Sequence, residues 1–147
     1  MLEVREVSRS FGSLKALDRV NFDVKPGRLT GFVGGNGAGK TTAMRIMMGV
    51  LSADSGEVRY NGQPVVREVS ARFGYMPEER GLYPKMGVRE QLVFFAQLHG
   101  VAKPMAERNA DSLLDRLGLE ARSQDAVEKL SLGNQQRAQI AAALVHD

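Results

Sequence analysis

A glycine-rich segment places the strongest constraint on the fold of this 147-residue chain. Residues 34–41 read Gly-Gly-Asn-Gly-Ala-Gly-Lys-Thr, which matches the pattern G-x-x-x-x-G-K-[ST]. The apolar segment Leu29 to Val33 precedes it, and a segment with helical spacing, Lys40 to Val50, follows it. The pattern therefore predicts a short buried strand, a loop and a helix in that order, which is typical of an α/β fold.

This loop has the chemistry needed to hold a chain of phosphates. Glycines adopt positive φ angles and turn successive backbone N–H groups toward one point, and the helix that follows adds its positive end. Lys40 is predicted to reach the β- and γ-phosphates, the Thr41 hydroxyl to ligate Mg²⁺, and Thr42 to add a phosphate contact. The alternative is a glycine-rich turn with an accidental Lys-Thr pair, and the order of strand, loop and helix disfavours it. The candidate nucleotide-binding residues here are Gly34, Gly35, Asn36, Gly37, Ala38, Gly39, Lys40, Thr41 and Thr42.

Alternation of apolar and charged residues predicts strands in the first part of the chain. Leu2 to Val7 and Leu17 to Val24 alternate, and Gly12-Ser13 lies between them, so an antiparallel pair is expected. A second hairpin is predicted at the turn dipeptide Asn61-Gly62. Phe73 to Met76 is predicted to be a further short strand.

The second part of the chain has helical patterns instead. Val88 to Leu98 places apolar residues on one stripe, and Pro104 begins a second helix that Gly118 is predicted to end. A third helix is predicted from Ser131 through Leu144. We therefore expect a nucleotide-binding part with strands and core over residues 1–78 and a helical subdomain over residues 79–147.

Composition excludes several other classes of protein. The chain has 20 Lys and Arg against 17 Asp and Glu, a net charge of +3, and these charges are scattered. This balance indicates a solvated surface rather than a nucleic-acid patch, so no nucleic acid is expected as a partner. Without cysteine there is neither a disulfide framework nor a thiolate metal site. The longest apolar stretches are too short to span a bilayer.

Residues 130–137, Leu-Ser-Leu-Gly-Asn-Gln-Gln-Arg, resemble the signature sequence of ABC (ATP-binding cassette) ATPases, usually written LSGGQ. Leu132 and Asn134 depart from that pattern. In the family two cassettes pair head to tail, and the signature Ser and Gly touch the γ-phosphate of ATP held by the partner. The resemblance implies these roles for Ser131 and Gly133. The alternative is that Ser131 only caps a helix.

The resemblance extends to two further positions. Phe11 stands where the family places an aromatic ring that stacks on adenine, although a Phe near a strand end is often a core residue. Glu78 stands where the family usually has a Gln that binds Mg²⁺ or the attacking water. A carboxylate also binds Mg²⁺, while the alternative for Glu78 is a solvated loop residue. Residues 78–83, Glu-Glu-Arg-Gly-Leu-Tyr, resemble an exporter subgroup related to sodium and drug efflux ATPases.

The resemblance implies a fold of the P-loop NTPase class, an ABC-type cassette. Its expected parts are an antiparallel β subdomain, a partial parallel core sheet and an α-helical subdomain, truncated before the strand called Walker B. The family's Mg²⁺-binding Asp, general-base Glu and switch His are then absent. His99, His146 and Asp147 lack the sequence context for those roles. We therefore expect this chain alone to hydrolyse ATP negligibly.

The function implied by the resemblance is that of the ATP-binding subunit of an ABC transporter, which couples ATP binding and hydrolysis to transport across a membrane. Its cofactors are ATP and Mg²⁺. Its expected partners are a second cassette in a head-to-tail dimer and integral membrane permease subunits, which places it at the cytoplasmic face of the cell membrane. The full-length parent is expected to be an ATP hydrolase. The alternatives are a soluble ABC ATPase that acts on nucleic acid or the ribosome, and a non-catalytic nucleotide-binding fragment.

Overall fold

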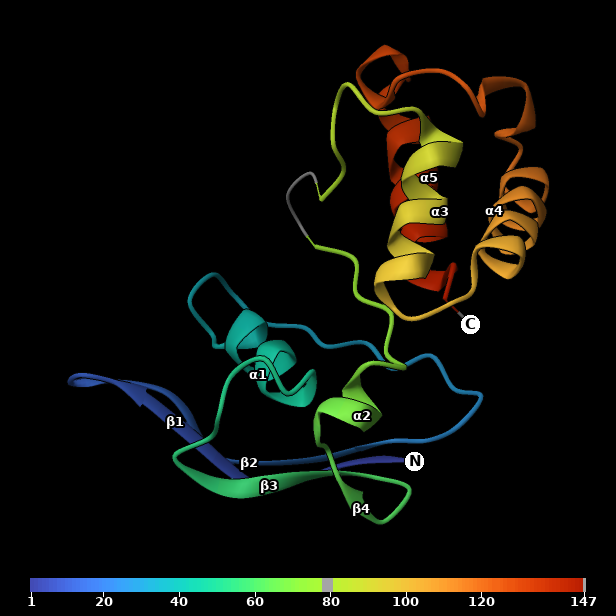
Figure 1. Ribbon diagram of the computed structural model, residues 1–147. Helices are drawn as coiled ribbons and strands as arrows, with labels where there is room; N and C mark the ends of the chain where they lie inside the picture. Colours follow the sequence, from blue (N-terminus) through green and yellow to red (C-terminus); the bar gives the residue numbers. More distant parts are fainter. Residues whose placement is uncertain (78–80, 147) are drawn as a thin grey trace. The chain divides into compact units, whose positions relative to one another are not determined.

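The computed structural model describes residues 1–77 and 81–146 and divides into two compact units, Met1–Phe73 and Gly74–Asp147 (Figure 1). Each unit has its own cluster of buried apolar side chains. The predicted division between residues 78 and 79 falls at the segment 78–80, outside the described residues, and stays a prediction.

The first unit contains an antiparallel sheet with the strand order β2-β1-β3-β4. The strands are β1 (Leu2–Phe11), β2 (Leu14–Val24), β3 (Ser55–Tyr60) and β4 (Gln63–Pro64). Both predicted hairpin turns are confirmed. Asn61 and Gly62 have φ angles of 51° and 78°, the positive values that a two-residue type I′ turn requires.

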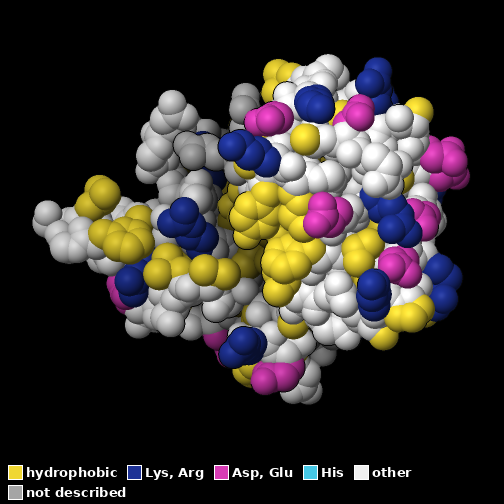
Figure 2. Space-filling model, turned by 45° about the horizontal axis from the view of Figure 1, so that its top comes forward, with side chains coloured by type: hydrophobic (Ala, Val, Ile, Leu, Met, Phe, Trp, Pro, Cys, Tyr) yellow, Lys and Arg dark blue, Asp and Glu magenta, His cyan; other side chains and the backbone are white. Residues whose placement is uncertain are grey.

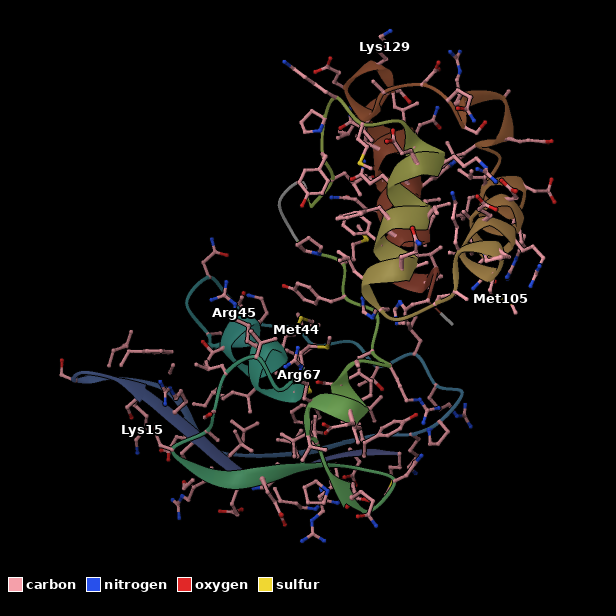
Figure 3. All side chains as sticks on the ribbon, viewed as in Figure 1. Lys15, Met44, Arg45, Arg67, Met105 and Lys129 are labelled. Carbon is pink, nitrogen blue, oxygen red and sulfur yellow. The ribbon has the colours of Figure 1, made fainter. Side chains whose placement is uncertain are left out.

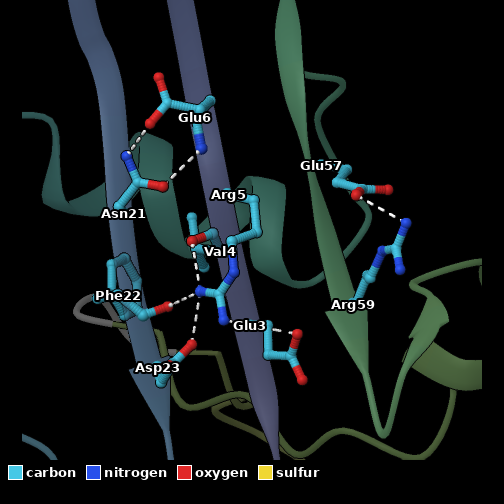
Figure 4. Close-up of polar contacts among 9 residues, drawn as sticks. All are labelled: Glu3, Val4, Arg5, Glu6, Asn21, Phe22, Asp23, Glu57 and Arg59. Atoms are coloured by element: carbon cyan, nitrogen blue, oxygen red, sulfur yellow. Dashed lines mark hydrogen bonds and ion pairs between the residues drawn. The ribbon is translucent and has the colours of Figure 1, made fainter.

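Polar side chains fasten the irregular stretch of the β1–β2 pair (Figure 4). Arg5 donates to the Asp23 carboxylate at 2.6 Å and to the backbone oxygen of Phe22 at 3.4 Å. Glu6 has a φ of 49°, and its N–H donates to the side-chain oxygen of Asn21 at 3.0 Å. The register shifts between Val4 and Val7, and such a bulge increases the twist of the strands.

Helix α1 (Lys40–Met47) packs on the sheet through Ala43 and Ile46. The methionines of this helix are at most partly buried: Met44 is 41% exposed and projects from α1 together with Arg45 (Figure 3). Small and branched side chains therefore make the closest contact between this helix and the sheet. The buried core of the unit consists of Val4, Val7, Leu17, Ala43, Ile46 and Val58. A short helix, α2 (Arg67–Ser70), follows the second hairpin.

Two predicted strands do not form. Residues 29–33 are irregular and lie in solvent, with Leu29 103% and Val33 96% exposed, and residues 73–76 are also irregular. The prediction of a buried strand before the loop is therefore wrong for this chain. A strand exists only where its backbone groups pair with a neighbour, and the described residues offer these segments none. The antiparallel part of the predicted fold is confirmed, whereas no parallel core sheet forms among the described residues.

The second unit is helical, as predicted. Its helices are α3 (Val88–Leu98), α4 (Lys103–Arg116) and α5 (Leu132–Leu144), with two short 3₁₀ turns, η1 (Glu120–Arg122) and η2 (Val127–Lys129). Gly118 follows the end of α4 with a φ of 66°, the left-handed conformation that ends many helices. Leu92, Leu114, Leu119 and Val145 are among the side chains buried between the helices.

Two polar contacts organise this unit. Arg89 of α3 binds Asp111 of α4 through both carboxylate oxygens, at 2.6 and 2.9 Å. These hydrogen bonds lower the pKa of Asp111. Gln91 is only 1% exposed, and its amide accepts from the backbone N–H of Tyr83 at 2.7 Å and donates to the Tyr83 carbonyl at 3.2 Å. Gln91 thereby fastens the segment before α3 to that helix.

Apolar side chains also reach the surface of the second unit. The ring of Tyr83 stacks on Phe95 with centroids 6.1 Å apart and meets the edge of Phe94 at 6.3 Å. Figure 2 shows hydrophobic side chains, some of them rings, gathered on the displayed face of the molecule among charged ones. Among the described residues, no helix is both long and apolar enough to cross a membrane.

We predict that Gln91→Met destabilises the second unit by about 1–2 kcal/mol, because both backbone groups of Tyr83 lose their partner. Urea unfolding measures the change, and faster hydrogen exchange of the Tyr83 amide locates it. Gln97→Met, on the exposed side of the same helix, is the matched control and leaves both readouts unchanged. Equal effects of the two variants would contradict the role assigned to Gln91.

Candidate functional site

The glycine-rich loop of residues 34–39 runs from the irregular segment 29–33 to the first residue of α1. Gly37 and Gly39 have φ angles of 80° and 82°, and the N–H of Ala38 donates to the carbonyl of Gly35 at 3.2 Å. The chain is therefore curled before the helix rather than extended. This is the local shape in which backbone N–H groups converge on an anion.

Gly39 seats the loop on the sheet. A Cβ atom at this position would lie 2.4 Å from the carbonyl oxygen of Ala16 and 2.8 Å from a methyl carbon of Leu17, both in β2. Glycine is required here for two independent reasons, the close backbone approach and the positive φ. The contact places the start of α1 directly beside β2.

Lys40 folds back over the loop. Its ammonium donates to the carbonyl oxygens of Gly34 at 2.7 Å and Gly35 at 2.8 Å. The charge is thus held beside the N-terminus of α1, where the helix end is also positive. Thr41 is exposed in the first turn. A cationic side chain, a helix N-terminus and a free hydroxyl around a curled loop fit a magnesium-bound triphosphate.

Phe11 lies toward the same end of the sheet as this loop. It ends β1 and is 47% exposed, so it is not a core residue. Phe11 pairs with Leu14 in the β1–β2 register, and Leu14 precedes Ala16, where Gly39 rests, by two residues. Two residues of a strand span about 7 Å. The structure therefore brings Phe11 and the glycine-rich loop to the same end of the sheet.

The other predicted site residues lie in the second unit. Ser131 is the N-cap of α5, and its hydroxyl accepts from the N–H of Asn134 at 3.4 Å. Gly133 is exposed, and a Cβ atom there would meet nothing within 4 Å. Packing within the chain therefore gives no reason for glycine at this position of a helix, where it is unfavourable.

One residue near this helix was missed by sequence reasoning. The side chain of Gln135 donates to the carbonyl oxygens of Val127 at 3.2 Å and Leu130 at 3.0 Å. It fastens the turn that leads into Ser131 and so positions the cap. A Gln in the first turns of a helix is the signal that points to such a contact, but it does not name the partner.

The structure brings together Phe11 and residues 34–42 in the first unit, and Ser131 and Gly133 in the second. Glu78, predicted as a Mg²⁺ ligand, lies outside the described residues. Among the residues that are described, no group of three or more His, Asp or Glu side chains forms a metal site. Of the two predicted Mg²⁺ ligands, the structure therefore describes only Thr41.

We predict that Gly39→Ala destabilises the first unit by about 2–4 kcal/mol, because the methyl group meets the Ala16 carbonyl and the φ angle is strained. Thermal unfolding followed by circular dichroism measures the change. The control is Gly31→Ala, where a Cβ atom meets nothing within 4 Å. An unchanged stability of Gly39→Ala would contradict the seating of the loop on β2.

Gly133→Ala is expected to act in the opposite direction. It raises the free energy of unfolding by about 0.5–1 kcal/mol, because alanine favours the helix and no neighbour obstructs its methyl group. Gly118→Ala is the matched control, and its positive φ of 66° makes that variant less stable. Denaturant unfolding of both variants checks the pair, and a loss of stability in Gly133→Ala would refute the open surface at this position.

Comparison with known proteins places this architecture in a family. Residues 17–147 match the family model described as ABC transporter. The chain is 42% identical over 146 residues to the ABC transporter ATP-binding protein YhaQ of Bacillus subtilis, covering 99% of this chain and 49% of YhaQ. It is 35% identical over 149 residues to the Nod factor export ATP-binding protein I of Paraburkholderia xenovorans, covering 99% and 49%.

A solved structure shares the fold. The cbiO1 protein of Clostridium perfringens, part of the ABC transporter complex cbiONQ, matches 99% of this chain and 61% of its own, with a TM-score of 0.86 and 26% identity. The chain spans about half the length of the curated relatives it matches. From the family match and the shared fold we conclude that this chain belongs to the ABC transporter ATP-binding proteins and has the ABC ATPase fold.

Proposed function

We propose that this chain is the nucleotide-binding portion of the ATP-binding subunit of an ABC transporter, of the exporter type. The proposal rests on the conformation of the glycine-rich loop. Gly39 packs against β2, and the ammonium of Lys40 donates to the carbonyl oxygens of Gly34 and Gly35. This places one positive charge and a helix N-terminus at the same point, which suits the phosphates of MgATP.

Each residue of the loop has a defined part in binding. The backbone N–H groups of residues 35–41 hold the phosphate oxygens, and Lys40 turns from the loop carbonyls to the β- and γ-phosphates. The Thr41 hydroxyl ligates Mg²⁺, which neutralises phosphate charge, and Thr42 adds a phosphate contact. Phe11 offers its exposed ring to the adenine base. These groups bind and orient the nucleotide.

Ser131 and Gly133 serve a second copy of the cassette. In a head-to-tail dimer they approach the γ-phosphate of ATP bound by the partner. Two observations support this: the Ser131 cap opens the N-terminus of α5, and Gly133 leaves that surface without a side chain although no neighbour requires this. A bare backbone allows the close approach that a phosphate needs.

The proposed partners are integral membrane permease subunits, which this chain contacts at the cytoplasmic face of the membrane. One relative is an export ATP-binding protein and a structural neighbour is part of a transporter complex. The exposed aromatic side chains of the second unit, Tyr83 and Phe94, support a protein interface. Glu78, which lies outside the described residues, is proposed as a second Mg²⁺ ligand.

Hydrolysis requires groups that residues 1–147 do not supply. The sequence contains no apolar strand that ends in adjacent Asp and Glu after Ser131, and neither His99 nor His146 stands in a loop that follows such a strand. Enzymes catalyse phosphoryl transfer almost entirely by positioning the reacting groups and by stabilising charge. We therefore propose that the full-length parent hydrolyses ATP, whereas this chain binds it and turns it over negligibly.

The proposal predicts that Lys40→Ala weakens MgATP binding at least about tenfold, because a charge-assisted contact to phosphate is lost. Titration of ATP into the chain, followed by NMR chemical shifts, measures the affinity, and phosphate release measures turnover. Lys25→Ala, in an exposed turn, is the matched control and binds as the unsubstituted chain does. Equal affinity of the two variants would refute the proposed function, and turnover at the level of a complete cassette would refute the proposed inactivity.

A further inference from the structure

A guanidinium group covers one side of the Phe11 ring. The central carbon of the Arg9 guanidinium lies 5.0 Å from the centroid of that ring. Residues two apart in a strand project from the same face, so β1 itself brings the pair together. At this distance the cation is attracted to the electron-rich face of the ring. The contact restricts the rotation of a side chain that is otherwise exposed at the end of a strand.

Arg9 is itself held from its far side. Its Nη1 donates to the Asp54 carboxylate at 2.7 Å. The other oxygen of Asp54 accepts from the N–H of Ser10 at 2.7 Å, and the N–H of Asp54 donates to the carbonyl of Ser8 at 2.9 Å. Asp54 is thus fixed to β1 by its backbone and by its side chain. The guanidinium lies between a fixed carboxylate and the ring.

The Arg9 guanidinium contacts the Asp54 carboxylate and the Phe11 ring. The Arg9 side chain is mostly buried, and its Nε has no hydrogen-bond partner among the described residues. A buried polar group gains most from an electron-rich surface within reach. Phe11 is 47% exposed although the guanidinium lies over its ring, so part of the ring stays open to solvent.

From this chain of contacts we infer that Arg9 is a positioning residue for nucleotide recognition. Asp54 holds Arg9, Arg9 holds Phe11, and the exposed part of the ring forms a preorganised platform for the purine base. The inference rests on the proposed function, because the triphosphate has to lie on the loop beside β2. Fixing the ring in advance lowers the entropy that is lost when the base stacks on it. Arg9 and Asp54 therefore favour nucleotides with a base over bare polyphosphate.

The experiment compares two ligands, ATP and inorganic tripolyphosphate, each with Mg²⁺ and titrated into the chain by NMR. Arg9→Gln is expected to lower the affinity for ATP about threefold, the value of one exposed cation–π contact, and to leave tripolyphosphate binding unchanged. Arg5→Gln is the matched control, since Arg5 lies on the same strand and pairs with Asp23 but covers no ring. It leaves the affinity for both ligands unchanged.

A double-mutant cycle separates positioning from a purely structural role. In a Phe11→Leu background, Arg9→Gln is expected to have no further effect on ATP affinity, because the ring that Arg9 holds is gone. Asp54→Asn leaves both Arg9 and the ring in place. It is expected to lower the affinity for ATP and to leave the affinity for tripolyphosphate unchanged. Circular dichroism of each variant identifies any that fails to fold, and Arg9→Met, which keeps a long side chain but removes the charge, then replaces Arg9→Gln in the cycle.

The outcomes point in distinct directions. An equal loss for ATP and tripolyphosphate, or an undiminished loss in the Phe11→Leu background, overturns the role of Arg9 while the proposed function stands. Failure of the unsubstituted chain to bind either ligand overturns the proposed function and this inference together. A loss confined to ATP that disappears with the ring supports the assignment.

Discussion

The close contact between Gly39 and the Ala16 carbonyl of β2 is the constraint on which the first unit depends. It allows the loop to end beside the sheet, so that α1 begins there and buries Ala43 and Ile46 in the core. The same contact brings the loop close to the end of the β1–β2 pair. A methyl group at this position would push α1 away from the sheet and separate the binding loop from Phe11.

Fixed polar contacts, more than buried area, determine the geometry of the candidate site. Lys40 is held by two loop carbonyls, and Arg9 is held by Asp54. In the second unit, Gln135 fastens the turn before Ser131 in the same manner. Lys40 and Arg9 belong to the first unit and Gln135 to the second, and each unit has its own apolar core. The loop before α1 and the cap of α5 are thus each shaped within their own unit.

Features that depend on a few adjacent residues were predicted well. Features that depend on contact with a distant segment of the chain were predicted poorly. The turn at Asn61-Gly62 and the cap at Ser131 follow from backbone preferences that a few residues express. The strand predicted over residues 29–33 is wrong because apolar residues favour a strand only when a neighbouring strand accepts their hydrogen bonds. Helical spacing over residues 40–50 does not by itself say which side chains of α1 meet the sheet; the structure buries Ala43 and Ile46 and leaves Met44 41% exposed.

The sequence by itself determined the family, the hairpins and the starts of the helices, since the glycine-rich and signature motifs, the turn dipeptides and the caps act over a few residues. Only the tertiary structure decided that Phe11 and the loop lie toward the same end of the sheet and that Gly39 fits against Ala16. It also decided that Asp54 holds Arg9, a contact between residues 45 positions apart. Contacts of this kind arise when the chain packs, and because they depend on the placement of distant segments they leave no local pattern in the sequence.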